Sequence, residues 1–235
     1  MATFYIVIAL VFVAVYIVFF MYMQNKRKKL VQAFADIDIY NEMQHAAQYK
    51  DEALSSDHAF IRSQLPVQTI DTFTVAAKQH TGKDVAKDLA KDTLKSMATL
   101  GTVRYTTVQT PKYLVLSGEE LHLLDIDTDG DVDRHLVFDR SRLEESELEE
   151  IPLTKVQAAQ AKGIGAEGLL KCYKLSLKTE TGFLVLNLYN MMLAPVISAQ
   201  EMFTQSGDKM RRNYVIGMDF LNRLGEKYRN LKIYM

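Results

Sequence analysis

An apolar run from Ala2 to Met23 constrains this chain more than any other feature of its sequence. Thr3 is the only clearly polar side chain in the run, which contains neither Pro nor Gly. As an α-helix, these 22 residues are about 33 Å long, which is enough for a bilayer hydrocarbon core of about 30 Å. A helix that is apolar on every side is not easily buried in a domain of this size. We therefore predict a transmembrane anchor over residues 1–25.

A cleaved signal peptide is the alternative interpretation of the same run. Such a peptide has a charged start, an apolar region of about 7–15 residues and a cleavage site made of small residues. Here the start carries no charged side chain, the run is longer, and the segment Phe20-Met21-Tyr22-Met23 contains no small residue. We therefore favour an anchor that is retained in the mature protein.

Basic residues follow the apolar run directly and predict its orientation. They are Lys26, Arg27, Lys28 and Lys29. Because cytoplasmic flanks carry an excess of Lys and Arg, we expect a single-pass protein of the plasma (inner) membrane, with its N-terminus outside and its C-terminal domain cytoplasmic. The single Cys172 agrees with a cytoplasmic domain, since one cysteine cannot form an internal disulfide. The four basic side chains are also candidate ligands for anionic lipid headgroups.

The overall composition is that of a folded protein that does not bind nucleic acid. Hydrophobic residues make up 48% of the chain and charged residues 24%, which excludes a disordered or fibrous chain. The chain has 28 Lys and Arg against 29 Asp and Glu, and its net charge is -1. A nucleic-acid-binding domain normally carries a basic excess. We therefore expect a lipid bilayer and a protein or membrane complex as partners, and no nucleic acid.

The region after the anchor is mostly helical in pattern. Residues 30–54 carry apolar side chains at helical spacing, so the anchor helix is expected to continue as a stalk. Ser55-Ser56-Asp57 then interrupts the pattern, and residues 63–82 are mixed. Residues 84–98 form an amphipathic helix with alternating Lys and Asp, which either lies on the membrane or, as we favour, docks on its own domain. We divide the chain into an anchor (1–25), a helical stalk or juxtamembrane region (26–100) and an antiparallel β domain with a C-terminal helix (101–235).

From residue 102 the pattern changes to strands, and one hairpin can be written in register. Asp129-Gly130 between residues 121–127 and 132–138 is a strong hairpin signal. The predicted pairs are Leu121 with Phe138, His122 with Val137, Leu123 with Leu136, Leu124 with His135, Asp125 with Arg134, and Ile126 with Asp133. The face that carries the Leu and Phe residues is expected to be core, closed at its end by an ion pair between Asp125 and Arg134.

The rest of the chain reads as short helices, a second hairpin and a long final helix. Residues 140–150 are polar and helical in pattern, residues 156–162 fit a further short helix, and residues 163–168 fit a flexible loop. Residues 173–188 alternate in polarity about Thr181-Gly182, which predicts a hairpin. Residues 208–230 have apolar side chains every three or four positions and form the clearest helix. The predicted fold class is α+β.

The segment Tyr113-Leu114-Val115-Leu116-Ser117-Gly118-Glu119-Glu120-Leu121-His122-Leu123-Leu124 resembles the strand–turn–strand opening of bacterial pleckstrin-homology-like (PH-like) domains. The final helix fits that family too, since the family fold is a bent antiparallel barrel or roll with a helix over one open end. The long insertion between Asp139 and Leu169 departs from the compact family pattern. The resemblance implies a binding or scaffolding domain, because some relatives bind lipid headgroups and many bind proteins.

An acidic run at the first hairpin resembles the start of a calcium-binding loop. The candidate ligands are Asp125, Asp127, Asp129 and Asp131. Closely spaced carboxylates repel one another unless water or a hard cation lies between them. However, Leu136 occupies the position where such a loop needs a bidentate Glu, and the flanks read as strands. We favour a solvated hairpin turn and no cofactor, with Ca²⁺ as a minor hypothesis.

Other patterns carry weaker chemical signals. Gly163-x-Gly165-x-x-Gly168 matches a dinucleotide-binding string but lacks the preceding strand and following helix that the motif requires. Cys172 has basic neighbours but no partner motif, so a structural role is favoured. His122 and His135 share one face of the hairpin diagonally in the predicted register, where ordinary surface pairing is favoured over a site. The sequence contains no GxSxG, P-loop or HExxH motif.

The C-terminal helix is basic and has two open interpretations. Its candidate residues for contact with anionic lipid or a partner are Arg211, Arg212, Arg223 and Arg229, and the alternative is a solvated face of a packed helix. Because no catalytic constellation is recognisable, we expect a membrane-anchored, non-enzymatic binding or scaffold module with a cytoplasmic PH-like domain. The alternatives are an anionic-lipid-sensing module, and an enzyme whose site is assembled from distant residues.

Overall fold

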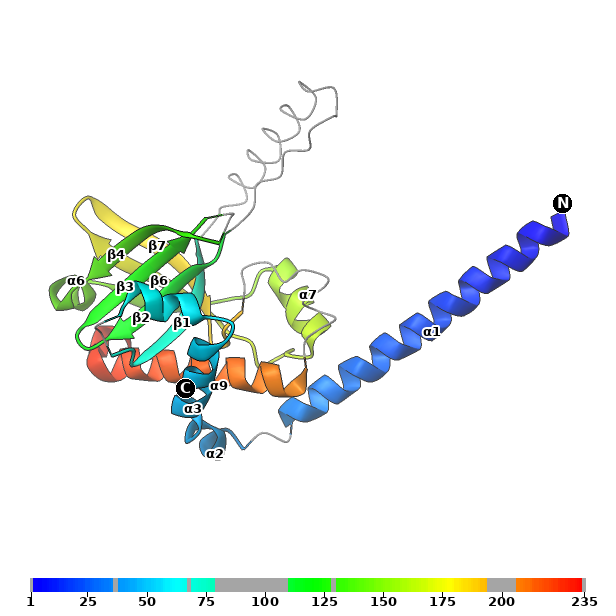
Figure 1. Cartoon of the computed structure of the whole chain (residues 1–235), viewed down its shortest axis with the longest axis horizontal. Helices are drawn as coiled ribbons and strands as arrows, with labels where there is room; N and C mark the ends of the chain where they lie inside the picture. The colour runs from blue at the N-terminus through cyan, green and yellow to red at the C-terminus, as the bar shows by residue number, and fades with distance from the viewer. Residues whose placement is uncertain are drawn as a thin grey trace, which may run out of the picture.

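A computed structural model of the chain describes residues 2–35, 38–66, 69–78, 110–127, 130–193 and 206–233 (Figure 1). Its helices are α1 (Ala2–Ala35), α2 (Ile39–Met43), α3 (Ala46–Ser55), α4 (Ala59–Gln64), α6 (Arg140–Glu144), α7 (Lys155–Ile164), α9 (Gly207–Lys227) and the 3-10 helix η1 (Arg229–Leu231). Its strands are β1 (Thr72–Lys78), β2 (Lys112–Ser117), β3 (Glu120–Ile126), β4 (Val132–Phe138), β5 (Glu147–Ile151), β6 (Cys172–Thr179) and β7 (Gly182–Tyr189). The predicted α+β class is confirmed.

The seven strands form one antiparallel sheet in the order β4-β3-β2-β1-β7-β6-β5. Strand β1 joins two halves of this sheet, because its residues 72–76 pair with β2 whereas its residues 76–78 pair with β7. Of the predicted barrel or roll, the barrel is wrong for the described strands, since β4 and β5 form the two ends of an open sheet. Helix α9 packs against both halves of this open sheet. Its residues Phe220, Leu221 and Leu224 share one core with side chains from each half.

Helix α9 is confirmed close to its predicted bounds. It begins after Ser206, whose side chain accepts a hydrogen bond from the backbone N–H of Lys209 and so caps a free donor of the first turn. The apolar stripe of the helix is buried along its whole length. Gly217 allows α9 to cross the chain after β7 closely, because a Cβ at this position would lie 2.8 Å from backbone atoms of Asn190 and Met191.

The β3–β4 hairpin has the predicted register over five of its six pairs, from Leu121–Phe138 to Asp125–Arg134. The sixth prediction is wrong, since Ile126 pairs with Val132 rather than Asp133. The shift arises at the turn, where the Asp127 carboxylate and backbone both bond to the backbone of Asp131. The predicted inner face is core, as expected.

The ion pair predicted to close this face is corrected in its partner. The carboxylate of Asp125 pairs with the ammonium of Lys112, which lies opposite it on the neighbouring strand β2. Arg134 stands opposite Asp125 on the other side but on the exposed edge strand. The side chain of Lys112 is only 13% exposed. Its charge is therefore screened less by solvent than that of the exposed Arg134.

The predicted stalk is not one continuous helix. Helix α1 ends at Ala35, and α2, α3 and α4 follow as separate short helices. Their apolar side chains, including Leu54 and Ile61, are buried against Phe73 of β1 and Val115 of β2. Strand β1 itself lies before the predicted boundary at residue 101 and yet is the central strand of the sheet. The predicted amphipathic helix 84–98 lies outside the described residues.

The segment predicted as a polar helix over residues 140–150 divides into α6 and the edge strand β5. Its acidic side chains suit a strand here because Glu149 pairs with Lys174 of β6 and Glu150 pairs with Lys171, which directly precedes β6. The short helix predicted next is confirmed as α7, which begins with a capping box between Thr154 and Gln157. The predicted loop begins later than expected, because α7 runs to Ile164. The second hairpin is confirmed as β6 and β7.

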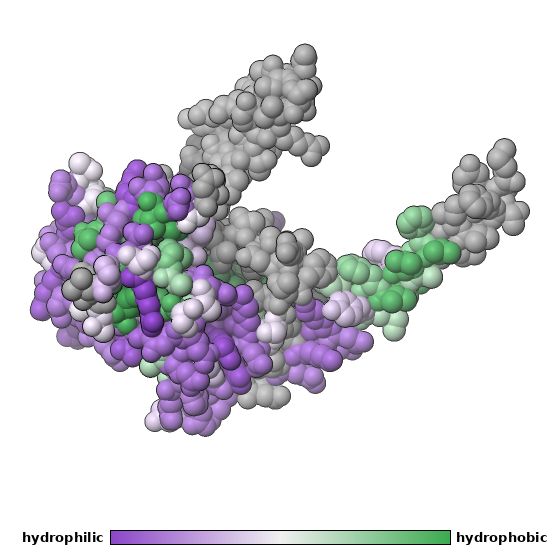
Figure 2. Space-filling view, viewed as in Figure 1, coloured by the Kyte–Doolittle hydropathy of each residue, from purple (hydrophilic) through white to green (hydrophobic). Residues whose placement is uncertain are grey.

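Helix α1 projects away from the sheet (Figure 1) and contacts α9 and α7 at its C-terminal end. Figure 2 shows apolar side chains along its projecting part and hydrophilic side chains where it reaches the domain. Large apolar side chains between Val11 and Tyr22 are exposed. Among the described residues, no helix is both long enough and apolar enough to cross a membrane. Part of the predicted anchor, residues 1–10, has side chains outside the described ones, so the anchor stays a prediction.

Candidate binding cavity between α3, α9 and the sheet

A cavity of about 620 Å³ lies where α3 and the N-terminal half of α9 meet β1 and β2. Its floor is apolar and includes Val75, Ile216 and Met192. These three residues belong to the core that covers the outer face of β1–β3. On the α3 side the wall is formed by Ala53, whose methyl group leaves space that a longer side chain would fill. The fold therefore leaves a hollow in an otherwise packed layer.

Aromatic rings form one wall of the cavity. The imidazole of His58 lies 5.3 Å from the ring of Phe73 and 5.4 Å from the ring of Tyr113, measured between centroids. Tyr113 in turn meets Phe60 edge to face at 5.0 Å. Burial lowers the pKa of His58, so its imidazole is neutral at pH 7. Its Nδ1 atom is buried and has no hydrogen-bond partner within the described part of the chain.

Ion pairs between α9 and the α3 region form the rim. Arg212 pairs with Glu52 and also lies over the ring of Tyr49, 5.4 Å from its centroid. Lys209 pairs with Asp57 at 3.3 Å. Asp208 also lines the cavity, so the lining has three carboxylates (Glu52, Asp57 and Asp208) and two cations (Lys209 and Arg212). The cations at the rim are therefore already matched by carboxylates of the same chain.

The basic residues predicted to bind lipid or a partner do not form one patch. Arg211 pairs with Glu42 of α2 and with Asp208, at 3.2 and 3.1 Å. Arg223 binds Asp219 one turn earlier on α9, and Arg229 is exposed in η1. Thus Arg211 and Arg212 lie beside the cavity region, whereas the other two lie toward the far end of α9.

The basic cluster after the predicted anchor lies on α1. Lys28 and Lys29 are exposed there, and Lys26 is half-buried. The side chain of Arg27 lies outside the described ones. Nothing brings the described lysines into the cavity lining.

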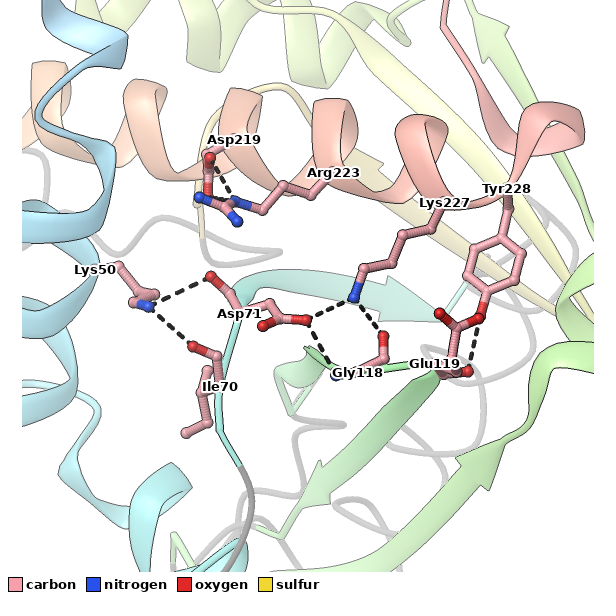
Figure 3. A network of polar contacts seen from close by, with 9 residues as sticks. All are labelled: Lys50, Ile70, Asp71, Gly118, Glu119, Asp219, Arg223, Lys227 and Tyr228. Atoms are coloured by element: carbon pink, nitrogen blue, oxygen red, sulfur yellow. Dashed lines mark hydrogen bonds and ion pairs between the residues drawn. The ribbon is translucent and has the colours of Figure 1, made fainter.

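A second polar network holds the start of β1 in place (Figure 3). The ammonium of Lys50 donates to the backbone oxygen of Ile70 at 2.9 Å. The carboxylate of Asp71 accepts from the ammonium of Lys227 at 2.6 Å and from the Gly118 N–H at 3.0 Å. The network thus ties α3, the β2–β3 turn and the end of α9 to one point. We interpret it as a structural clamp.

The two hairpin histidines lie on one face, as predicted, but His122 is buried, which corrects the predicted surface pairing. Nδ1 of His122 lies 2.9 Å from Nε2 of His135, within hydrogen-bond distance. Nε2 of His122 lies 3.6 Å from the carboxylate of Glu120. His122 is buried whereas His135 is exposed, and burial, followed by the charge of His135, lowers the pKa of His122. The pair lies on the outer face of the sheet and does not line the cavity.

The acidic hairpin residues serve the turn in the structure. Asp125 pairs with Lys112, and Asp127 accepts a hydrogen bond from the backbone of Asp131. Asp129 lies outside the described residues. Across the described ranges, no group of three or more His, Cys, Asp or Glu side chains is arranged to hold a metal ion. The Ca²⁺ hypothesis gains no support from the described carboxylates.

The remaining sequence motifs have structural roles. Cys172 is buried at the start of β6, and burial raises its pKa to about 11, so it is a neutral thiol at pH 7. The glycine string begins in the last turn of helix α7 and precedes strand β6, which is the reverse of the order in a dinucleotide site. Gly165 ends α7 in the left-handed region, with a φ of 79°.

Comparison with known proteins gives no relative for this arrangement. No family model matches the chain, and no curated protein or solved structure is significantly similar to it.

The cavity residues were not found from the sequence, apart from Arg212. His58, Tyr113 and Lys209 are far apart along the chain and share no spacing pattern. One signal pointed near them, which was the interruption at Ser55-Ser56-Asp57. In the structure this interruption turns the chain between α3 and α4 and places His58 beside the sheet.

Proposed function

We propose that this protein is a membrane-tethered, non-enzymatic binding module that docks a protein partner at the cavity between α3 and α9. The observation that carries the proposal is the cavity itself: about 620 Å³, with an apolar floor and a charged rim. This volume is within the range of about 300–1,000 Å³ that is typical of ligand sites. In the same proposal, α1 anchors the domain in the plasma membrane with the domain on the cytoplasmic side.

Two features support a PH-like domain. The strand order β4-β3-β2-β1-β7-β6-β5 places two antiparallel meanders side by side, joined by β1. Helix α9, near the C-terminus, then packs against side chains from both meanders. Both features match the bent sheet and closing helix that the sequence resemblance implies, although the sheet is open. A domain of this kind serves binding and scaffolding.

The lining chemistry favours binding over catalysis. His58 is the one imidazole among the described lining residues. Its ring neighbours are Phe73 and Tyr113, and its buried Nδ1 has no hydrogen-bond partner among the described residues. The carboxylate of Asp57 acts on it through its charge, whereas a catalytic base is usually oriented by a hydrogen bond to a carboxylate. The hydroxyl of Ser56 in the same lining donates to the backbone oxygen of Glu52 at 2.8 Å, so it is held away from a nucleophile's role.

The anionic-lipid alternative finds weaker support. Binding a phosphate headgroup needs cations that are not already matched, and Arg211, Arg212 and Arg223 are each held by a carboxylate. Exposed Lys28 and Lys29 on α1 are compatible with headgroup contact, but that contact would accompany any anchor flank. Lipid therefore enters the proposal as the surface that holds the domain.

The test uses the full-length protein, extracted in a mild detergent and purified with its bound components. Ala53→Phe places a ring in the cavity, and Ala47→Phe adds the same ring to an exposed position of the same helix. We expect a stoichiometric protein partner with the wild type and with Ala47→Phe, and its loss with Ala53→Phe. Recovery of the chain alone, or equal partner recovery with Ala53→Phe, would overturn docking at this cavity. The membrane anchor is tested separately by fractionation of cells that express residues 1–235 or 26–235.

A further inference from the structure

We propose that the cavity between α3 and α9 takes an aromatic side chain of a partner polypeptide, carried on a segment whose neighbouring residues are not acidic. This inference rests on the proposed docking function and names the chemistry of its ligand. Two observations lead to it: the apolar floor with its aromatic wall, and the charge of the rim.

The floor and wall favour an aromatic anchor. Val75, Ile216 and Met192 provide apolar surface at the bottom of the cavity. The rings of Tyr113 and His58 stand at its side, where an aromatic ligand gains edge-to-face contacts in addition to burial. Protein interfaces concentrate their binding energy in a few such anchors, of which Trp and Tyr are the most frequent. A small polar ligand would leave most of this surface without a partner.

The rim selects against acidic flanks. The lining carboxylates are Glu52, Asp57 and Asp208, and Arg211, which pairs with Asp208, also pairs with Glu42. With these pair partners the rim has four carboxylates and three cations. Lys209 and Arg212 each lie in an ion pair with one of these carboxylates. An acidic ligand would have to displace a carboxylate that belongs to the chain, and it would face the excess negative charge. A neutral or basic segment meets neither obstacle.

The chain contains no Trp, so the fluorescence of a Trp-containing ligand can be excited without a protein background at the red edge of absorption. The ligands are three N-acetylated, C-amidated tripeptides: Gly-Trp-Gly, Lys-Trp-Lys and Glu-Trp-Glu. They are titrated with the full-length chain in a mild detergent, which adds no Trp, for the wild type, Ala53→Phe and Ala47→Phe. The readout is the saturable blue shift of the indole emission.

We expect the neutral and lysine-flanked peptides to bind at least fivefold more tightly than the glutamate-flanked peptide. Their blue shift should persist with Ala47→Phe and disappear with Ala53→Phe. Equal or tighter binding of the glutamate-flanked peptide overturns the charge argument. Binding that survives Ala53→Phe, or no binding of any peptide, overturns the aromatic-anchor proposal. In those cases a partner that is still lost with Ala53→Phe in the purification leaves the docking function standing, so the two failures are distinguishable.

Discussion

The two faces of strands β1–β3 are built from neighbouring residues of the same strands, yet they differ in how completely they are filled. The inner face, which carries Leu114, Leu116 and Leu121, packs against β6, β7 and α9 in a core without exposed side chains. The outer face, which carries Phe73 and Val115, packs against α3 and α4. On that outer side lie the cavity, two buried or half-buried imidazoles and several rim ion pairs.

The difference follows from what covers each face. The inner face is covered by a long amphipathic helix and by strands whose side chains interdigitate, so each space is filled from several sides. The outer face is covered by the short helices α3 and α4, with a turn between them, and by Ile216 at one side of α9. The cavity lies where these helices meet. Stability is therefore concentrated on one side of the sheet, and the capacity to bind on the other.

The largest expected difference in stability is between substitutions at two adjacent residues of β2, whose side chains point to opposite faces of the sheet. Leu114→Ala should lower the free energy of unfolding by about 3 kcal/mol, because it opens a cavity in the inner core. Tyr113→Ala should cost roughly 1 kcal/mol, since the ring is half-buried beside an existing hollow. Urea unfolding of both variants measures the difference. Equal losses would show that the outer face is as tightly packed as the inner one.

A second comparison tests tight and loose packing by adding atoms. Gly217→Ala should destabilise the protein by about 1–2 kcal/mol, because its Cβ would lie 2.8 Å from the backbone of Asn190 and Met191. This clash outweighs a gain of about 1 kcal/mol in helix propensity. Ala53→Phe adds a whole ring but places it in the cavity, so its effect should stay within about 1 kcal/mol. Thermal unfolding in the same buffer ranks the two, and the reverse order would contradict the assigned cavity.

The contrast between the faces also shows which features a sequence can reveal. The inner face of the β3–β4 hairpin was predictable because alternation and the Asp129-Gly130 turn together fix the register, and five of six pairs agree. Helix α9 was predictable because its apolar residues recur every three or four positions. Both signals are local, so neighbouring residues carry them.

Features that depend on distant partners were missed. The acidic composition of residues 147–151 favours a helix in the sequence, but Lys174 of β6 and Lys171, just before β6, pair with them in strand β5. Strand β1 was assigned to the stalk. Its own residues do not indicate that it pairs with both β2 and β7, which lie far along the chain. The cavity combines residues from positions 49 to 216, so no spacing pattern reports it. The predicted ion pair of Asp125 failed for the same reason, because Lys112 lies on another strand.

The buried imidazoles of the outer face should make stability depend on pH. Burial lowers the pKa of both His122 and His58 in the folded protein, below the value of about 6.5 expected when unfolded. Between these values the unfolded chain binds more protons, so the free energy of unfolding should fall as pH drops below about 6.5, by up to roughly 1.4 kcal/mol per pH unit for each histidine.

Substitution separates this effect from that of the carboxylates. Urea unfolding at pH 7.0 and pH 5.5 should show a smaller loss for His122→Gln than for the wild type, by about 1 kcal/mol. His58→Gln should act in the same direction, and the double variant should show the smallest loss. A loss that is unchanged in all three variants would exclude these imidazoles as the source.

The smallest effect is expected at the clamp, where the two faces share the start of β1. Asp71 and Lys227 are about three-quarters buried, with exposed side-chain fractions of 25% and 27%, and the Gly118 N–H also binds the Asp71 carboxylate. A double-mutant cycle with Asp71→Asn and Lys227→Met should give a coupling of about 0.5–1 kcal/mol. The matched pair is Arg142 and Glu180, whose exposed fractions are 36% and 85% and whose coupling should be close to zero. Similar couplings in the two cycles would mean that the clamp is an ordinary surface pair, and that β1 is held in place by packing on its two faces alone.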